Sequence, residues 1–466
     1  MSFSANFILE QFAKSPDHIA FVNDNREFTY RWVLETTPTY EAFLDETGIR
    51  SGDVVAVVAD YSPEVFCFIL AAFRRGLVLA PLSHDSIIEK DAILEVSQCQ
   101  WFVEFATELA DIVVERRSAV PDNPVLTGFL ERGNPGLLLF SSGSTGQPKG
   151  ILHDVNSVLE KFRKPRPPVV AITFLMLDHF GGINTLFHIL SNIGTVVTVK
   201  QRSVATICEA IERHRVQLLP TTPSFLNVLV HADAASRYDL SSLRTISYGT
   251  EVMPQTTLDR LRRIFPDAKL QQTYGLSELG VLRSQSRSDG SLWFKVGGEG
   301  FQTKVVDDIL WIKSDYAMVG YLNAPSPFDK QGWFNTQDRV EVDGDYIKIL
   351  GRTSDLINIG GRKVYPTEIE EVIVALDNIK DVAVFAEKNA ILGQIVVAQV
   401  VVNSPEEAKS LRKRVRRACA DSLAAYKVPS KVELAPGDLY SARQKKIRGE
   451  KVPRPPAFGA SEQSKS

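Results

Sequence analysis

Cysteine is scarce in this chain, and no two cysteines form a C-x-x-C pair. The four are widely separated: Cys67, Cys99, Cys208 and Cys419. This spacing argues against a disulfide scaffold and against a cysteine zinc site. Long apolar runs are also missing, because the longest one, near residues 65–73, has about half the length that a membrane-spanning helix needs.

An excess of charge of one sign and a leader segment are missing as well. The chain has 53 Lys and Arg against 56 Asp and Glu, a formal net charge of −3. This balance excludes a strongly basic nucleic-acid footprint and a highly acidic disordered chain. The start, Met1 to Asn6, has no basic region followed by an apolar signal core. We therefore expect a soluble, cytoplasmic protein with no membrane span and no nucleic-acid partner.

The composition that is present is that of an ordinary globular protein. Hydrophobic residues make up 44% of the 466 residues, and charged residues make up 23%. Because this length exceeds what one typical core supports, we expect two or more packed units.

The first part of the chain alternates between strand-like and helix-like runs. Val54 to Val58 reads as a buried strand, residues 63–73 have a helical pattern opened by Ser62, and residues 78–81 return to a strand. Such a βαβ rhythm predicts a parallel sheet covered by helices, with ligands beyond the strand ends. Further strands are expected at 137–140, 194–200 and 216–219, with a helix at 204–214.

The pattern changes after Arg352. From Tyr346 onward it reads strand, helix, strand, strand, helix, strand, and Ser404 to Glu407 has the form of a capping box for the second helix. We expect an α/β protein with a large N-terminal domain of parallel-rich sheets covered by helices, and a small mobile α+β C-terminal domain. The expected boundaries are 1–353 for the first domain and 354–452 for the second, with a disordered tail at 453–466.

Residues 141–150 carry the strongest chemical signal. The run Ser-Ser-Gly-Ser-Thr-Gly-Gln-Pro-Lys-Gly follows an apolar strand directly. Small hydroxyl and glycine residues let the backbone approach an anion closely, and Lys149 adds a charge suited to phosphate. The spacing differs from the common NTPase P-loop, because Pro148 and Gly150 flank the lysine, and it contains no G-x-S-x-G nucleophile elbow. Taken alone, the tract would also suit a flexible surface loop.

The same ten residues match, nearly residue for residue, the signature of the adenylate-forming (AMP-binding) superfamily. This superfamily includes acyl- and aryl-CoA synthetases, luciferases and peptide-synthetase adenylation domains. Thr273 to Glu278 resembles its Tyr-Gly-x-Thr-Glu block, and Gly332 to Asp338 resembles its Gly-Trp-Phe-x-Thr-Gly-Asp block, with Gln337 at the usual glycine. Gly351 to Glu370 resembles its hinge block. The resemblance covers almost the whole chain, and the early loop implies a compact member with a shortened N-terminal region.

The resemblance implies that a carboxylic acid is activated with ATP to an acyl-adenylate, with release of pyrophosphate. Because this step brings two anions together, the site must supply fixed positive charge and hydrogen-bond donors. Glu278 would bind Mg²⁺, a hard cation suited to carboxylate oxygen. Tyr274 would lie against adenine, and Asp338 would accept from the ribose hydroxyls with Arg352 assisting. The implied nucleotide-binding residues are Ser141, Ser142, Gly143, Ser144, Thr145, Gly146, Lys149, Thr273, Tyr274, Gly275, Ser277, Asp338 and Arg352.

The acid pocket is implied by the Phe-His motif of acyl- and aryl-activating members, where His179 takes the histidine position. The pocket residues expected on this basis are His179, Phe180, Gly249, Thr250 and Gln272, and His179 is also a catalytic candidate. Amino-acid-activating members place an aspartate in this region, and Asp178 is adjacent. We therefore favour an acid without an α-amino group and keep an amino acid as an alternative.

The resemblance also implies a hinge and a mobile lysine. The hinge falls at Ser354 with Asp355 beside it, and Gly360 and Gly361 would line the path of the thiol. The family pattern Ser-Gly-Lys-Ile has no full match, because the run here is Gln444-Lys445-Lys446-Ile447. Aligning on Ile447 makes Lys446 the catalytic candidate, with Lys445 as the alternative.

The thiol acceptor is coenzyme A in this interpretation, because no carrier domain follows the C-terminal unit. The pantetheine arm of a separate carrier protein is the alternative acceptor, and an amide-forming synthetase would pass the acyl group to an amine instead. A nucleotide-binding pseudo-enzyme is the alternative outside catalysis, but such a protein would be expected to have lost several of the ligating positions.

Overall fold

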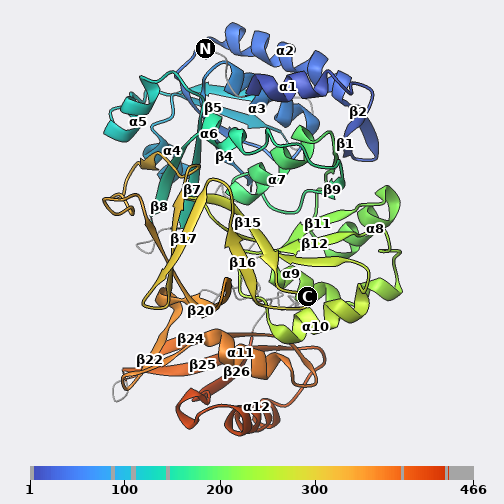
Figure 1. Cartoon of the computed structure of the whole chain (residues 1–466), viewed down its shortest axis with the longest axis vertical. Helices are drawn as coiled ribbons and strands as arrows, with labels where there is room; N and C mark the ends of the chain where they lie inside the picture. The colour runs from blue at the N-terminus through green and yellow to red at the C-terminus, as the bar shows by residue number, and fades with distance from the viewer. Residues whose placement is uncertain are drawn as a thin grey trace, which may run out of the picture.

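The computed structural model describes residues 5–84, 90–106, 112–142, 147–389, 393–435 and 439. Within these ranges the strands form three seven-stranded sheets, one three-stranded sheet and one two-stranded sheet. Figure 1 shows strands of the second and third sheets beside one another in the middle of the molecule, with the C-terminal elements at one end of its long axis. No helix in the described ranges has the length and hydropathy needed to cross a membrane.

The first sheet has the strand order β19-β8-β7-β4-β3-β5-β6. Its strands are β3 Val54–Val58, β4 Val78–Leu82, β5 Trp101–Phe105, β6 Ile112–Arg116, β7 Gly136–Ser142, β8 Pro148–Asp154 and β19 Gly320–Tyr321. The strands β3, β4, β5 and β7 are parallel, and β8 returns antiparallel to β7. The parallel sheet expected from the βαβ rhythm is therefore confirmed. The short loop that joins β7 to β8 lies at the carboxyl end of the parallel strand β7.

The second sheet has the order β13-β12-β11-β9-β10-β1-β2 and is parallel except for the β1–β2 hairpin. Its strands are β1 Ile19–Asn23, β2 Arg26–Thr29, β9 Val170–Ile172, β10 Thr195–Val197, β11 Leu218–Thr221, β12 Thr245–Tyr248 and β13 Lys269–Gln272. The strand expected at 216–219 begins two residues later than its apolar run suggested. Val216 instead packs in the core after helix α8 (Val204–His214).

In the third sheet, each strand from β14 to β18 in the sheet order pairs antiparallel with its neighbour. The sequence pattern did not indicate this antiparallel sheet. Its order is β14-β15-β16-β21-β20-β18-β17. Its strands are β14 Tyr274–Leu276, β15 Gly280–Ser286, β16 Phe294–Gly297, β17 Phe301–Val306, β18 Ile309–Ser314, β20 Phe334–Asp343 and β21 Tyr346–Arg352. Burial alternates along the first part of β20, but the buried positions include the polar residues Thr336 and Asp338, which explains why its hydrophobic pattern is weak.

Helices cover the two parallel sheets, and one core joins them. The α-helices of this part are α1 Ala5–Phe12, α2 Tyr30–Thr47, α3 Pro63–Arg74, α4 Lys90–Ser97, α5 Pro124–Leu130, α6 Val155–Glu160, α7 Phe180–Ser191, α8, α9 Pro223–His231 and α10 Gln255–Ile264. Helix α3 begins as expected, because the Ser62 hydroxyl accepts from the Val65 amide at 3.1 Å. The rings of Phe66 on α3 and Phe187 on α7 lie 5.7 Å apart in the shared core.

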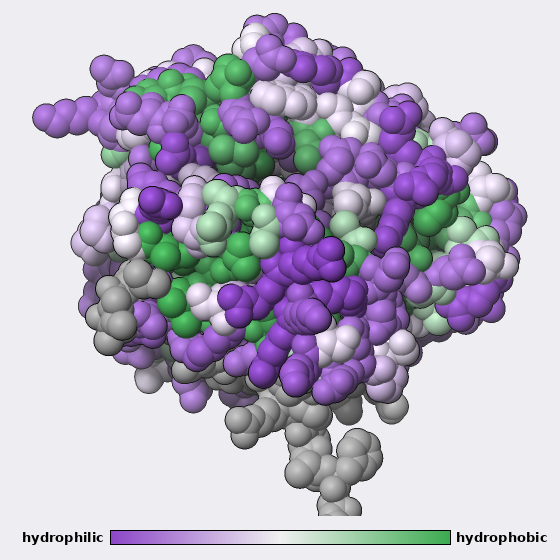
Figure 2. Space-filling model, turned by 90° about the horizontal axis from the view of Figure 1, so that it is seen from below, coloured by the Kyte–Doolittle hydropathy of each residue, from purple (hydrophilic) through white to green (hydrophobic). Residues whose placement is uncertain are grey.

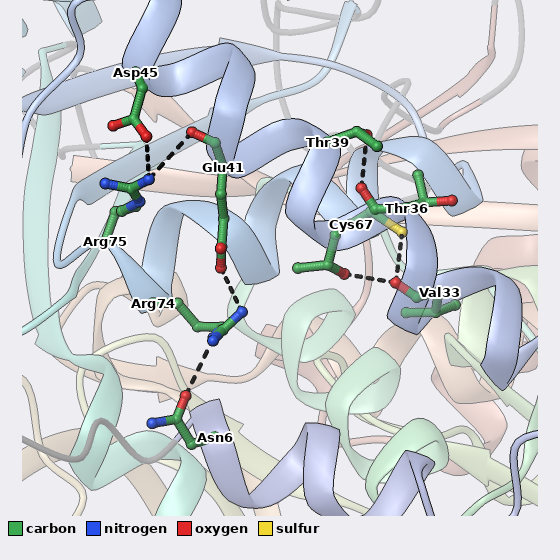
Figure 3. Close-up of polar contacts among 10 residues, drawn as sticks. Asn6, Val33, Thr36, Thr39, Glu41, Asp45, Cys67, Arg74 and Arg75 are labelled. Carbon is green, nitrogen blue, oxygen red and sulfur yellow. Dashed lines mark hydrogen bonds and ion pairs between the residues drawn. The ribbon is translucent and has the colours of Figure 1, made fainter.

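Two consecutive arginines fasten the end of α3 to its neighbours (Figure 3). Arg74 pairs with the Glu41 carboxylate of α2, and its Nε donates to Asn6 Oδ1 of α1 at 3.2 Å. Arg75 pairs with Asp45, also on α2, and donates to the Glu41 carbonyl oxygen at 3.4 Å. Because the Arg74–Glu41 pair is only partly exposed, it orients α1 and α2 more firmly than the exposed Arg75–Asp45 pair does.

The C-terminal part has a core of its own. It comprises the hairpin β22 Ile357–Ile359 and β23 Arg362–Val364, then α11 Pro366–Val374, β24 Ile379–Asn389, β25 Gly393–Val402, α12 Ala408–Ser422 and β26 Lys431–Leu434. Short 3₁₀ turns lie at η2 Ala234–Ser236, η3 Thr353–Asp355 and η4 Ala425–Lys427. The α+β pattern is confirmed, with the β22–β23 hairpin as an additional element. The core packs Ile369 of α11 and Val415 of α12 against Val384 of β24.

The capping box expected at Ser404 to Glu407 is wrong. Helix α12 begins at Ala408 after Glu407, with no side-chain cap bond. Ser404 instead donates its hydroxyl to Asn378 Oδ1 at 2.8 Å, and Glu406 pairs with Arg414 at 2.7 Å. The Ser404 hydroxyl is therefore committed to Asn378, and Glu407, which would have closed the box, is itself the residue before the helix.

Helix α12 forms part of the end of the molecule that is seen in Figure 2. Its exposed basic residues are Lys409, Arg412, Lys413, Arg416 and Arg417. Hydrophilic residues gather at the centre of this face, with smaller hydrophobic areas beside them.

Candidate active site

A cavity of about 670 Å³ lies where the second sheet, the third sheet and the C-terminal part meet. The expected site residues that line it come from separate motif blocks: Thr250, Gln272, Thr273, Tyr274, Gly275, Asp338, Arg352, Ser354 and Asp355. Residues between 250 and 355 thus converge on one space. Cavities of this size hold small ligands and cofactors, and placement at the carboxyl ends of parallel strands is usual for them.

Asp338 is the most tightly held polar group of this cavity. The Tyr274 hydroxyl donates to Asp338 Oδ2 at 2.5 Å, and Arg352 Nε donates to Asp338 Oδ1 at 3.1 Å. Asp338 and Arg352 are direct partners across strands β20 and β21. The backbone amide of Asp338 donates to the Thr336 hydroxyl at 3.1 Å, which orients the start of this strand segment. The carboxylate is therefore a fixed acceptor, with one hydrogen bond to each of its oxygens.

Burial and charge oppose each other at this carboxylate. Asp338 is 6% exposed, and burial raises its pKa, while the charge of Arg352 and the hydrogen bond from Tyr274 lower it. Burial also raises the pKa of Tyr274, and the neighbouring carboxylate adds to that rise. Tyr274 therefore stays a neutral donor at ordinary pH, which leaves Asp338 to carry the negative charge of the pair.

Gln337 departs from the family motif, and the structure shows what the glycine position requires. Its φ is +61°, in the left-handed region that glycine adopts most easily. Two hydrogen bonds support this backbone: the Gln337 amide donates to Asn335 Oδ1 at 2.9 Å, and the Thr353 hydroxyl donates to the Gln337 oxygen at 3.3 Å. The conformation is thus kept without glycine.

Strands β12 and β13 end side by side at the cavity, and Gly249 allows their close approach. A Cβ on Gly249 would lie 2.4 Å from Thr273 Oγ1 and 2.8 Å from the Thr273 carbonyl oxygen. Thr273 is held there by its amide, which donates to the Tyr248 oxygen at 2.7 Å. The next residue, Thr250, has φ +71°, a strained value for a β-branched residue. Such strain clusters at functional sites.

The expected phosphate loop is only partly described. Residues 143–146, which include Gly143, Ser144, Thr145 and Gly146, lie outside the described residues. The ends of the loop are the last residues of β7 and the first of β8, where Ser141 faces Lys149 and Ser142 faces Pro148. The described residues on either side of the segment thus belong to two antiparallel strands, whereas the common P-loop leads from a strand into a helix.

Asn323 holds the second strand of this hairpin on both sides of Lys149. The Asn323 side-chain amide donates to the Pro148 oxygen at 2.9 Å, and its Oδ1 accepts from the Gly150 amide at 3.0 Å. The Leu322 amide also donates to the Gly150 oxygen, at 2.9 Å. The backbone that carries Lys149 is therefore fixed by a segment more than 170 residues away.

Glu278 and Lys149 meet at one buried tyrosine. The Tyr321 hydroxyl donates to Glu278 Oε1 at 2.7 Å, and Lys149 Nζ lies 5.5 Å from the centroid of the Tyr321 ring. Burial, and then the Glu278 charge, raise the pKa of Tyr321. Opposite charges thus flank one aromatic ring at the loop, which is the combination that a metal-bound phosphate needs.

The residues present offer a Mg²⁺ ion a carboxylate ligand, Glu278, but not a complete set of protein ligands among the described residues. No group of three or more His, Cys, Asp or Glu in the described ranges could hold a metal by itself. Glu278 offers a carboxylate next to the cationic Lys149, and Mg²⁺ is typically held by one or two carboxylates together with substrate phosphates and water. A protein-only metal cage is therefore not what this site supplies.

The expected acid-pocket residues divide into two groups. Thr250 and Gln272 line the cavity. His179 and Phe180 lie instead at the start of helix α7, where the His179 carbonyl oxygen accepts from the Gly182 amide at 3.0 Å. Asp178 is buried, and the Ser83 hydroxyl donates to its Oδ2 at 3.1 Å.

Behind Phe180 lies a buried histidine. His153 is fully buried, its ring centroid lies 5.0 Å from that of Phe180, and its Nε2 hydrogen bonds with the Ser277 oxygen at 2.6 Å. His153 thereby connects strand β8, the segment around Ser277 and Glu278, and the start of α7.

The expected hinge and thiol-path residues occupy different places. Ser354 and Asp355 line the cavity, in the short turn η3 that follows β21. Gly360 and Gly361 form the exposed turn of the β22–β23 hairpin, with φ of +54° and +84°. Positive φ at both positions explains the glycines. Lys445 and Lys446 lie outside the described residues.

Sequence reasoning missed three residues that organise this region: Tyr321, Asn323 and Asn227. The Asn227 side-chain amide lies on α9 and donates to the Lys380 oxygen at the start of β24, at 3.1 Å, which joins the N-terminal and C-terminal parts. Each of the three acts on a segment more than 40 residues distant. Neither hydrophobic periodicity nor a local sequence motif predicts such long-range hydrogen bonds.

Two family models match this chain. The model of the AMP-binding enzyme family matches residues 8–308, and the model of the AMP-binding enzyme C-terminal domain matches residues 368–446. The chain belongs to the AMP-binding enzyme family. The resemblance drawn from the motifs is therefore confirmed.

The relatives of this chain include CoA ligases and an acyl-CoA synthetase. The chain is 27% identical to 4-coumarate:CoA ligase 1 of Petunia hybrida over 453 residues, which cover 84% of this chain and 83% of the relative. It is 24% identical to acyl-CoA synthetase 7 of Caenorhabditis elegans over 512 residues, which cover 95% and 94% of the two chains.

Solved structures share the fold over nearly the whole chain. The anthranilate CoA ligase AuaEII in complex with anthranoyl-AMP has a TM-score of 0.80 at 19% identity, with 96% of this chain and 95% of that chain covered. The amide bond synthetase McbA from Marinactinospora thermotolerans has a TM-score of 0.73 at 20% identity, with 92% and 95% covered. The mixed α/β architecture with a large N-terminal and a smaller C-terminal domain is therefore confirmed.

Proposed function

We propose that this chain activates a carboxylic acid with ATP to an acyl-adenylate, releases pyrophosphate, and transfers the acyl group to the thiol of coenzyme A. The observation that carries the proposal is the cavity in which Tyr274, Asp338 and Arg352 form one hydrogen-bonded group beside Thr250 and Gln272. The resemblance assigns Tyr274, Asp338 and Arg352 to the nucleotide, and Thr250 and Gln272 to the acid pocket. Family membership and the CoA ligase relatives support the reaction class.

In the first half-reaction, the fixed Asp338 carboxylate would accept hydrogen bonds from the ribose hydroxyls. Tyr274 would contact adenine, and Lys149 with the residues of the 141–150 loop would hold the phosphates. A Mg²⁺ ion bound through Glu278 would neutralise phosphate charge. Positive charge that is already in place lowers the barrier to joining two anions, because the site does not reorganise as charge builds up.

In the second half-reaction, the C-terminal unit would turn about Ser354. We place the boundary there, with units at 1–353 and 354–452. The turn would bring the Gly360-Gly361 hairpin to the thiol path. The hydrogen bond from Asn227 to the Lys380 oxygen joins the two units in the present arrangement, and it would have to break in that turn.

The nature of the acid and of the acceptor is a separate part of the proposal. The Asp178 carboxylate accepts from Ser83 in a buried setting, which favours an acid without an α-amino group. Coenzyme A is the proposed acceptor, in line with the names of the relatives. A carrier protein is the second acceptor to test. An amine is the third, because an amide bond synthetase shares the fold.

A panel experiment tests the proposal. The protein is incubated with ATP, Mg²⁺ and aryl, fatty and amino acids in turn, and pyrophosphate release is measured. Coenzyme A, a pantetheinyl carrier protein or an amine is then added, and the products are identified by mass spectrometry. We expect one class of acid to release pyrophosphate and to yield an acyl-CoA. Failure of every acid would favour a nucleotide-binding protein without this activity.

A further inference from the structure

Asn227 is a buried asparagine at the junction of the N-terminal and C-terminal parts. It lies in the second turn of helix α9 and is 6% exposed. Its Nδ2 donates to the Lys380 carbonyl oxygen of strand β24 at 3.1 Å, and its Oδ1 accepts from the Thr257 hydroxyl of helix α10 at 3.2 Å. One side-chain amide thus links two helices of the N-terminal part to the C-terminal part.

The orientation of this amide follows from its two partners. A backbone carbonyl oxygen can only accept a hydrogen bond, so the Nδ2 of Asn227 must face Lys380. The Oδ1 atom then faces Thr257, whose hydroxyl donates to it. Thr257 is 2% exposed, so its hydroxyl has little access to water that could compete for this bond. Thr257 therefore holds the amide of Asn227 with its donor directed at the C-terminal part.

The C-terminal part closes over the cavity in the arrangement that this bond holds. Glu370, Val374 and Val382 of the C-terminal part line the cavity together with the expected nucleotide residues. Gly360 and Gly361 are exposed in the β22–β23 turn and do not line it. Under the proposed function the thiol path requires this hairpin at the cavity. The bond from Asn227 therefore belongs to the arrangement that precedes acyl transfer.

We propose that Asn227 is a positioning residue, which holds the C-terminal part in the arrangement for adenylate formation and so sets the balance between the two half-reactions. This inference rests on the proposed function and on its turn about Ser354. Because Lys380 would move with the C-terminal part, its bond to Asn227 stabilises one arrangement and not the other. A net hydrogen bond shifts a two-state equilibrium about fivefold, so this one amide changes which half-reaction is favoured.

Asn192 offers a matched control inside the N-terminal part. It is also a buried asparagine, 9% exposed. Its Nδ2 donates to the His188 oxygen at 2.7 Å, and its Oδ1 accepts from the Arg166 amide at 2.6 Å. Replacing Asn192 thus removes two hydrogen bonds of a buried amide without touching the junction. A loss of stability will appear in variants of both asparagines, whereas a change of arrangement is expected for Asn227 alone.

Distances between the two parts test the inference without any substrate. Spin labels are attached at Glu209→Cys and Lys413→Cys, two exposed positions on α8 and α12, and the distance distribution is measured by double electron–electron resonance. The four native cysteines are buried, so the reagent reaches the introduced pair. We expect Asn227→Leu to raise the population of a second distance, relative to the main wild-type distance, about fivefold. Asn192→Leu should keep the wild-type distribution.

Two further variants sharpen this measurement. Asn227→Asp places an oxygen against the Lys380 carbonyl oxygen, so it should shift the populations further than Asn227→Leu does. Thr257→Val keeps Asn227 and removes the donor that orients it, so the shift should be smaller and in the same direction. Thr257→Val also carries the test if the Asn227 variants fail to fold by circular dichroism. Wild-type distance distributions in these variants would overturn the inference.

Half-reaction rates separate this inference from the proposed function. Single-turnover release of pyrophosphate, and single-turnover transfer from preformed acyl-adenylate to coenzyme A, are measured for each variant. In Asn227→Leu the ratio of the first rate to the second should fall about fivefold, whereas Asn192→Leu should keep the ratio. If no acid releases pyrophosphate, the proposed activity fails and the distance measurement still decides the role of Asn227. An active enzyme with an unchanged ratio in Asn227→Leu would contradict that role.

Discussion

The Tyr274 hydroxyl donates a 2.5 Å hydrogen bond to Asp338 across 64 residues of sequence. This contact joins two motif blocks that the sequence shows only as separate runs. Because Tyr274 lies on β14 and Asp338 on β20, at different positions in the third sheet, the sheet brings the two side chains together. The two motif blocks, which were recognised separately in the sequence, therefore meet at one place, where the Asp338 carboxylate accepts the hydrogen bond.

Removing this donor should weaken ATP binding. Tyr274→Phe leaves a buried carboxylate oxygen without its hydrogen bond, which costs about 1–3 kcal/mol. We expect KM for ATP to rise roughly 5-fold to 100-fold on that basis. Steady-state pyrophosphate release measures it. Tyr346→Phe, on strand β21 of the same sheet, is the control and should leave KM unchanged. Equal effects of the two variants would contradict the role of the Tyr274–Asp338 bond.

Asn323 should act on the phosphate loop without touching the acid. Asn323→Ala removes the hydrogen bonds on both sides of Lys149, so the hairpin that carries this lysine loosens. We expect KM for ATP to rise about 30-fold, in keeping with two lost hydrogen bonds of about 1 kcal/mol each, while KM for the acid stays the same. Asn134→Ala is a matched control, because Asn134 bonds Asp154 at the opposite end of the same strand. An equal rise in both variants would argue for general loosening of the sheet.

Gly249 should tolerate no side chain. Gly249→Ala drives a Cβ into the Thr273 backbone, so β12 and β13 must separate at the cavity. We expect a loss of about 1–3 kcal/mol in the free energy of unfolding, together with reduced activity. Gly128→Ala, in helix α5 with open space around it, is the control and should be neutral or stabilising. Urea denaturation curves compare the two. A neutral Gly249→Ala would show that the strand ends separate easily.

His153 should make the fold sensitive to acid. Burial lowers the pKa of its ring from 6.5 to about 4. Between these values the unfolded chain binds a proton that the folded chain does not, so the unfolding free energy falls as pH drops from 6.5 to 4. At about 1.4 kcal/mol per pKa unit, the loss reaches about 3 kcal/mol.

Thermal melts across this pH range check the prediction. His153→Gln should reduce the dependence of melting temperature on pH by about half, because burial lowers the pKa of His188 to about 4 as well. His18→Gln, at an exposed position, should keep the wild-type slope. Parallel curves for wild type and His153→Gln would contradict the assignment of this acid sensitivity to His153.

The C-terminal lysine can be tested without a structural description of its segment. Lys446→Ala should lower adenylation about 100-fold or more, as loss of a charge contact made in the transition state does. Lys445→Ala should have a small effect and is the matched control. Exchange of pyrophosphate into ATP measures both. Near-wild-type exchange in Lys446→Ala would show that the alignment on Ile447 is wrong.

Local patterns predicted the elements with strong periodicity. The buried strand Val54–Val58, the Ser62-capped helix α3 and the α+β pattern after Arg352 all agree with the structure. Each depends on residues close in sequence. The third sheet escaped prediction because the buried face of β20 includes the polar residues Thr336 and Asp338, so its hydrophobic pattern is weak. The capping box at Ser404 failed because the Ser404 hydroxyl bonds Asn378 and the helix begins only after Glu407.

The sequence by itself determined the family, because the family's motifs are runs of adjacent residues that need no three-dimensional information. It also named Tyr274, Asp338, Arg352 and Glu278 as candidates. Only the tertiary structure decided which of them share a space. Hydrogen bonds from Tyr321 to Glu278, and from Asn323 to both sides of Lys149, join residues 43 or more positions apart. Such contacts follow from how sheets pack against each other, and a linear pattern carries no record of that packing.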